Sequence, residues 1–138
     1  MISASEEQTK KLAAEFANTL KGGEVVFLEG DLGSGKTTFV RGVVEAFGFD
    51  EPVRSPTFTI MNQYPVSRDQ IKSILHLDLY RIEDGSELEA LALKEELGQP
   101  DAVTFIEWPM NALEHYGIQA TNTIKFRTEG TEHKIEIN

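Results

Sequence analysis

Residues 30–37 read Gly-Asp-Leu-Gly-Ser-Gly-Lys-Thr, which matches the phosphate-binding loop pattern Gly-x-x-x-x-Gly-Lys-Thr. The pattern indicates a nucleotide site only where a strand precedes it and a helix follows it. The apolar run 25–28 predicts a buried strand before the loop, and the apolar residues after it recur at helical spacing up to Gly48: Phe39, Val40, Val43, Val44 and Phe47. This context favours a nucleotide-binding loop over a Gly-rich turn that matches by chance.

Such a loop binds phosphate oxygens through successive backbone N–H groups and the positive end of the following helix. We predict that Lys36 contacts the β- and γ-phosphates and that the Thr37 hydroxyl binds Mg²⁺. The predicted nucleotide-binding residues of the loop are Asp31, Leu32, Gly33, Ser34, Gly35, Lys36, Thr37 and Thr38.

Length and charge restrict the classes of function. A chain of 138 residues predicts one domain, residues 1–138, without room for a separate substrate domain. The net charge of −10 argues against unaided binding to nucleic acid or to an anionic membrane surface. The chain has no cysteine, and we see no leader or membrane-spanning run, so we expect a soluble cytoplasmic protein.

The rest of the pattern predicts an α/β fold, a P-loop NTPase-like mixed β-sheet flanked by helices and containing antiparallel hairpins. Overlapping capping boxes, Ser3 with Glu6 and Ser5 with Gln8, predict that the first element is a helix. Further predicted elements are an antiparallel pair 58–64 and 71–80 joined by a surface loop 65–70, a short helix within 86–97, a buried strand 102–106, and a hairpin of 123–127 with 133–137.

Two carboxylates end predicted strands. Glu107 follows the buried strand, where a metal-binding carboxylate of a nucleotide site is expected, although an ordinary surface carboxylate is the alternative. Asp78 shares a strand face with His76 and Tyr80, while the leucines between them would face the core. That polar face could equally be a solvated one.

Ser55 and Thr57 follow the loop helix at a distance typical of a switch segment, with a tight turn as an equal alternative. Trp108 follows Glu107 and is either a residue near the nucleotide or a packing residue.

Four motifs in order resemble the TsaE (YjeE) family of P-loop ATPases: residues 28–39, Ser-Pro-Thr-Phe at 55–58, His-Leu-Asp-Leu-Tyr-Arg at 76–81, and Glu-Trp at 107–108. The resemblance implies a cytoplasmic Mg²⁺-dependent ATPase of tRNA threonylcarbamoyladenosine synthesis that acts with TsaB and TsaD and contacts tRNA only through their complex. Ser34 replaces the family's usual alanine.

The resemblance also implies residue roles. Thr37 and Glu107 would bind Mg²⁺, and Asp78 would be a catalytic or metal-organising carboxylate alongside Lys36. Thr57 would be the switch threonine, and Thr9 would lie near the base; from the sequence alone Thr9 is a helix-surface residue. Two alternatives stay open at this point: a nucleotide-gated binding module without obligatory hydrolysis, and a small-molecule kinase.

Overall fold

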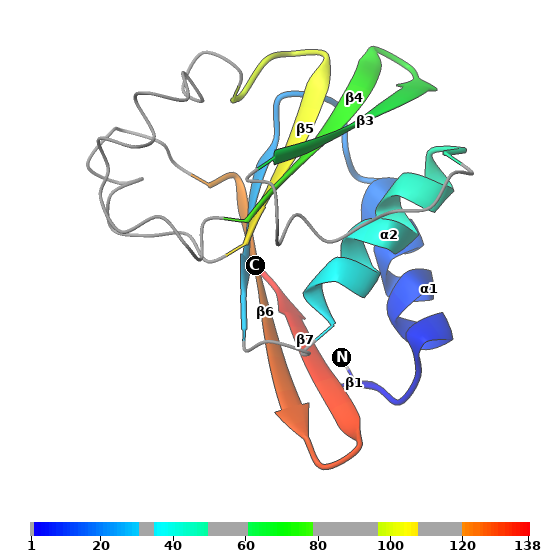
Figure 1. The fold of residues 1–138 in the computed structure, drawn as a ribbon, viewed down its shortest axis with the longest axis vertical. Helices are drawn as coiled ribbons and strands as arrows, with labels where there is room; N and C mark the ends of the chain where they lie inside the picture. The colour runs from blue at the N-terminus through cyan, green and yellow to red at the C-terminus, as the bar shows by residue number, and fades with distance from the viewer. Residues whose placement is uncertain (1, 31–34, 50–60, 79–96, 108–119) are drawn as a thin grey trace.

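The computed structural model describes residues 2–30, 35–49, 61–78, 97–107 and 120–138 (Figure 1). These residues form a mixed seven-stranded sheet with the order β1-β7-β6-β2-β5-β4-β3. The strands are β1 (Ile2–Ser3), β2 (Val25–Glu29), β3 (Met61–Arg68), β4 (Ile71–Asp78), β5 (Ala102–Glu107), β6 (Asn122–Glu129) and β7 (Glu132–Ile137). The predicted α/β fold with a mixed sheet and antiparallel hairpins is confirmed.

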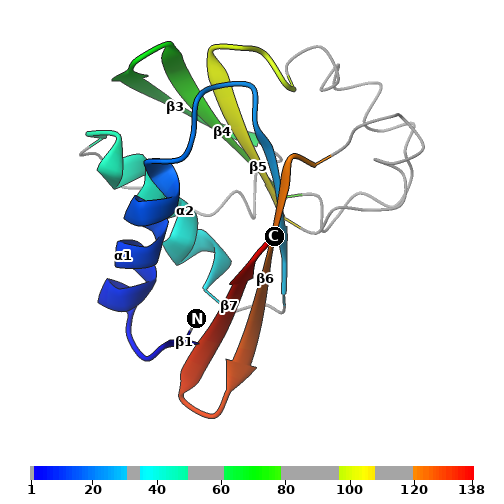
Figure 2. The same ribbon diagram turned by 180° about the vertical axis from the view of Figure 1, so that it is seen from behind.

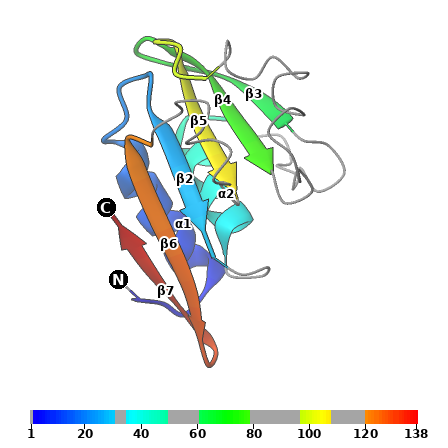
Figure 3. The ribbon, with the colours of Figure 1, turned by 90° about the vertical axis from the view of Figure 1, so that its left-hand side faces the viewer.

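Four neighbouring strands, β4, β5, β2 and β6, run parallel to one another. Their carboxyl ends therefore lie at the same end of the sheet (Figure 3). In α/β proteins this is the end at which ligands bind. Because β2 lies between β5 and β6, the predicted phosphate-binding loop leaves the sheet from the middle of that end.

The two described helices, α1 (Glu6–Ala17) and α2 (Lys36–Ala46), pack side by side against one face of the sheet (Figures 1 and 2). Alternate residues of the strands fill the space beneath them, including Val26, Leu28, Phe105 and Ile124. Phe39 of α2 lies at the centre, with aromatic neighbours Phe16 and Phe126 at ring-centroid distances of 5.8 and 5.7 Å.

Strand β5 is buried along its whole length, as the continuous apolar run 102–106 predicted. Val103 and Phe105 belong to the core under the helices, whereas Thr104 and Ile106 alternate onto the other face and are also fully buried. The strand is thus covered on both faces.

The prediction that a helix comes first is wrong. Ser3 is part of β1, where it pairs with His133 of β7, and it does not cap the helix. Ser5 is the N-cap of α1: its hydroxyl accepts a hydrogen bond from the Gln8 N–H at 3.2 Å, and Gln8 Oε1 accepts one from the Ala4 N–H at 2.7 Å. Of the two overlapping capping patterns, only that of Ser5 caps the helix, and it forms half of a capping box, because Gln8 accepts from Ala4 and not from Ser5 itself.

The antiparallel pair β3–β4 is confirmed, but the predicted surface loop 65–70 is too long. Strand β3 continues through Pro65 to Arg68, so that Asp69 and Gln70 alone make the turn. Proline cannot donate a hydrogen bond to a neighbouring strand, but β3 is an edge strand and its register shifts between Pro65 and Arg68. Both features accommodate proline in a sheet.

The predicted C-terminal hairpin is confirmed as β6 and β7, which are joined across Gly130 and Thr131. The predicted helix within 86–97 falls almost entirely outside the described residues, as do residues 58–60 and 79–80 of the predicted strands.

Candidate nucleotide-binding site

The described ends of the phosphate-binding loop have the geometry that the motif requires. Strand β2 ends at Glu29, and α2 begins at Lys36 directly after Gly35. Gly35 has a φ of 104°, a left-handed conformation that strains residues with a side chain, which explains a glycine here. Asp31, Leu32, Gly33 and Ser34 lie outside the described residues, so their contacts stay predictions.

Lys36 is the first residue of α2, and it is only 4% exposed. Its Nζ donates a hydrogen bond to the Gly30 carbonyl at 2.5 Å, so the side chain reaches from the helix back to the start of the loop. A buried ammonium group is costly unless polar partners surround it. A lysine held across the loop in this way suits the binding of an anion. Thr37 and Thr38 follow in the first turn of α2, and both are half-buried.

Glu107 ends β5 and is 4% exposed, so the alternative of an ordinary surface carboxylate is wrong. In the register of the sheet it lies between Leu28 of β2 and Asp78 of β4. The two predicted carboxylate residues therefore end neighbouring parallel strands beside the strand that leads into the loop. The side chain of Asp78 lies outside the described set.

His76 of β4 approaches the same carboxylate. Its Nε2 lies 3.1 Å from Oε2 of Glu107, and the imidazole is fully buried. The interpretation of this strand face as a solvated one is therefore wrong at His76, although Leu75 and Leu77 are buried as predicted. Sequence analysis gave His76 no role of its own. Its position two residues before Asp78 placed both on one strand face, but the contact with Glu107 depends on the pairing of β4 with β5, which the sequence does not reveal.

The donor set fits Mg²⁺ bound together with a nucleotide. Within the described ranges, no cluster of three or more His, Cys, Asp or Glu side chains could hold a metal ion by itself. Mg²⁺ does not require one, because it is usually held by one or two carboxylates with substrate phosphates and water. The Glu107 carboxylate and the Thr37 hydroxyl supply such oxygen donors at the end of the sheet where the loop begins.

The family resemblance predicts that Thr9 lies near the base, whereas the sequence pattern predicts that it lies on the helix surface. It is 2% exposed, so the surface interpretation is wrong. Its hydroxyl lies 2.7 Å from the Ser3 hydroxyl, which itself donates to the Ser5 carbonyl at 2.8 Å. Thr9 must therefore donate to Ser3, and its contact with a base stays a prediction. Ser55, Thr57 and Trp108 lie outside the described residues.

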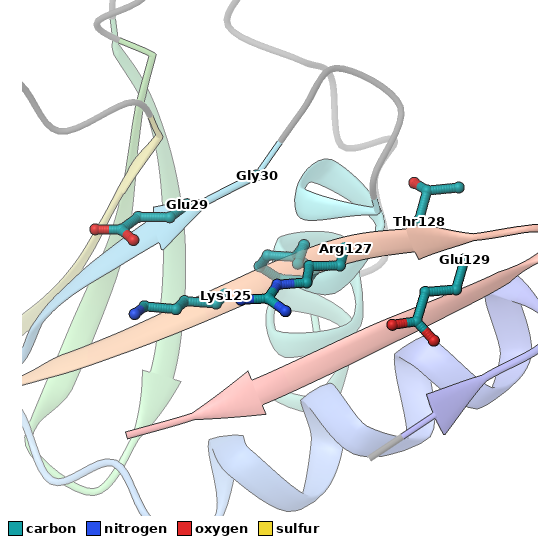
Figure 4. A pocket seen from close by; sticks show the side chains of 7 residues that line it. Glu29, Gly30, Lys125, Arg127, Thr128 and Glu129 are labelled. Atoms are coloured by element: carbon teal, nitrogen blue, oxygen red, sulfur yellow. The ribbon is translucent and has the colours of Figure 1, made fainter.

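A pocket of about 600 Å³ opens beside the start of the loop (Figure 4). Glu29, the last residue of β2, lines it together with Gly30, and residues 125–129 line it from β6. Lys125 and Arg127 bring two exposed cations to this place in an acidic chain. Sequence analysis missed them because an alternating hairpin pattern does not reveal which strand the hairpin will pair with. The pairing of β6 with β2, which sets Lys125 opposite Glu29, brings them to the loop.

Comparison with known proteins identifies the family of the chain. The family model described as "Threonylcarbamoyl adenosine biosynthesis protein TsaE" matches residues 3–136. A tRNA threonylcarbamoyladenosine biosynthesis protein TsaE from Aquifex aeolicus is 49% identical over 86 residues, which are 61% of this chain and 62% of that protein. Its namesake from Bacillus subtilis is 43% identical over 102 residues, 74% of this chain and 61% of that protein. The chain thus spans less than two thirds of the length of these relatives.

The fold also has a solved counterpart. The crystal structure of Bacillus subtilis YdiB matches with a TM-score of 0.65 and 29% sequence identity, covering 98% of this chain and 80% of that one. No helix in the described part of the chain is long and apolar enough to cross a membrane. The family model covers the loop, the two carboxylates at the strand ends and nearly the whole sheet. The chain therefore belongs to the TsaE family of threonylcarbamoyl adenosine biosynthesis proteins.

Proposed function

We propose that this chain is a cytoplasmic, Mg²⁺-dependent ATPase required for the threonylcarbamoyladenosine modification of tRNA at position 37. The observation that carries the proposal is the buried Glu107 carboxylate at the end of β5, beside the strand that leads into the phosphate-binding loop. P-loop NTPases use a carboxylate at this place to hold the metal or to orient the attacking water. Membership of the TsaE family supports ATP as the nucleotide.

Each predicted residue has a role in this proposal. The backbone of residues 31–38 binds the phosphates, and Lys36 neutralises the β- and γ-phosphates. Thr37 and Glu107 hold Mg²⁺, which neutralises charge that develops on the transferred phosphoryl group. Asp78, next to Glu107 in the register, organises the metal or positions the water.

The proposed partners are TsaB and TsaD, and tRNA is reached only through their complex. The net charge of −10 supports this indirect contact, because the chain by itself repels a polyanion. Hydrolysis would act through Ser55 and Thr57, the proposed switch residues, on a surface that binds the partners. We propose no contact with DNA or with a membrane.

The test is ATP turnover measured with TsaB and TsaD present. We expect Lys36→Ala and Glu107→Gln each to lower kcat about 100-fold or more, since each removes a charge that acts on the reacting phosphates. Lys72→Ala and Asp101→Asn are matched controls, because both residues are exposed and lie at the starts of β4 and β5, at the end of the sheet opposite the loop, and they should leave turnover unchanged. Unaltered turnover in both site variants would mean that the mechanism is wrong.

The same assay separates the alternatives. If a non-hydrolysable ATP analogue supports repeated rounds of tRNA modification as well as ATP does, the chain is a nucleotide-gated binding module and hydrolysis is not required. If phosphate appears on a small hydroxyl compound instead of in solution, the chain is a kinase.

A further inference from the structure

We propose that His76 is a positioning residue that holds the Glu107 carboxylate in the orientation needed for the metal. The inference rests on the proposed function, in which Glu107 is a Mg²⁺ ligand. It goes beyond it by assigning a role to a buried side chain that acts through Glu107.

The contact itself is the first argument. Nε2 of His76 lies 3.1 Å from Oε2 of Glu107, and the two side chains are 0% and 5% exposed. A carboxylate removed from water to this extent needs a donor or a positive partner. In the described part of the chain, His76 is the ion-pair partner recorded for Glu107.

The alignment of the contact is the second argument. The distance is within hydrogen-bonding range, but neither ring nitrogen of His76 makes an aligned hydrogen bond to any described residue. A small rotation of the ring or the carboxylate would bring the Nε2–H into line with Oε2 of Glu107. Hydrogen bonds in catalytic sites are often misaligned in the free protein and tighten when ligand binds.

The sheet explains why His76 can act as a fixed support. It lies opposite Phe105 in β5 and Asn62 in β3, two residue pairs before Asp78 and Glu107 and on the same face of the sheet. Strand β4 is hydrogen-bonded on both sides, so the imidazole has little freedom to move.

The sheet register sets a second acidic residue next to Glu107, because Asp78 is its partner in β4. A donor that binds Oε2 fixes the Glu107 carboxylate in one orientation and leaves Oε1 for the metal. Side chains that orient a metal ligand in this way typically contribute 10- to 100-fold in metal affinity or activity, as an order of magnitude.

The experiment measures binding of Mn²⁺, as a probe for Mg²⁺, to the ADP complex of the full chain by electron paramagnetic resonance. His76→Leu removes the donor, whereas His76→Gln keeps an N–H donor at the same reach. Ile74→Val controls for lost packing on the same strand face, and His133→Gln controls for loss of a histidine elsewhere.

We expect His76→Leu to weaken Mn²⁺ binding about tenfold and His76→Gln to restore most of it, with ADP affinity in EDTA unchanged. Both controls should bind Mn²⁺ like the wild type. Equal Mn²⁺ affinity in the wild type, His76→Leu and His76→Gln would overturn the proposal, and so would equal losses in the leucine and glutamine variants.

A metal-free measurement covers the case in which His76→Leu does not fold. Nitrogen-15 NMR of the free protein should show the His76 tautomer with its proton on Nε2, and Glu107→Leu should remove that preference. A proton on Nδ1 in the wild type would contradict the assigned contact.

The Glu107→Gln variant separates this inference from the proposed function. If Mn²⁺ binding is insensitive to Glu107→Gln, the metal-ligand role in the proposed function fails. If binding depends on Glu107 but not on His76, only the positioning role fails.

Discussion

Gly42 lies where α2 packs tightly against α1. A Cβ atom added there would lie 2.7 Å from the Ala13 Cβ and 2.9 Å from the Lys10 Cα. Alanine favours a helix by about 1 kcal/mol over glycine, but overpacking of a tight contact costs about 1–3 kcal/mol. Since Lys10 Cα belongs to the backbone of α1 and cannot rotate away, we expect Gly42→Ala to lower the free energy of unfolding by about 1–2 kcal/mol in urea denaturation.

Ala13→Gly provides the matched test of this explanation. It removes the nearest atom, so the double variant Ala13→Gly/Gly42→Ala should be more stable than the sum of the two single effects predicts. Additive effects would show that the inserted methyl group does not meet Ala13, and a stabilising Gly42→Ala would contradict the close approach to α1.

At the same scale, the site divides into residues that the sequence could identify and residues that it could not. Glu107 was identifiable because an acidic residue directly follows a continuous apolar run. His76 and Lys125 were not, because their roles depend on which strands are neighbours. Alternation assigns a residue to one face of a strand, but it does not say what covers that face.

At the scale of elements, the turn of the β3–β4 hairpin contains a strained residue. Asp69 has a φ of 54°, and it is the one non-glycine residue with positive φ among those that the structure describes. We expect Asp69→Gly to be at least as stable as the wild type, and Asp69→Ala to lose about 1 kcal/mol, because alanine has neither the freedom of glycine nor a polar side chain to bond locally. Thermal unfolding of the two variants, with exposed Ser67→Ala as control, measures the difference.

A loss of stability in Asp69→Gly as large as that in Asp69→Ala would show instead that the aspartate side chain itself stabilises the turn.

In the same hairpin, the sequence pattern predicted the end of the first strand wrongly. Proline at position 65 was interpreted as the start of a loop, and only the position of β3 at the edge of the sheet allows the strand to continue.

The whole molecule carries a net charge of −10, so mutual repulsion opposes its compact state. We expect an increase in NaCl from about 0.02 M to about 0.2 M to raise Tm by about 2–5 °C in scanning calorimetry, since salt screens this repulsion. If residues 1–138 form the single domain predicted, the calorimetric and van't Hoff enthalpies should agree.

A variant with less charge tests the cause. Replacing exposed Glu7, Glu15 and Glu132 by glutamine should raise Tm at low salt and reduce the response to NaCl. An undiminished response would mean that salt acts by another route.

At the scale of the whole molecule the sequence indicated the class of fold. The order of the strands was unpredictable, because the pairs β2–β6 and β1–β7 join segments from distant parts of the chain.

The two hairpin turns have a practical consequence. The turn at Asp69 and Gln70 and the turn at Gly130 and Thr131 lie at opposite ends of the sheet (Figures 1 and 3). Because the chain contains no cysteine, one introduced at Thr131 or at Gln70 would be the sole thiol for attaching a fluorophore. Two single-cysteine variants can therefore carry the same dye, one near the loop and one at the far end of the sheet, so that changes near the loop can be told apart from changes of the whole molecule.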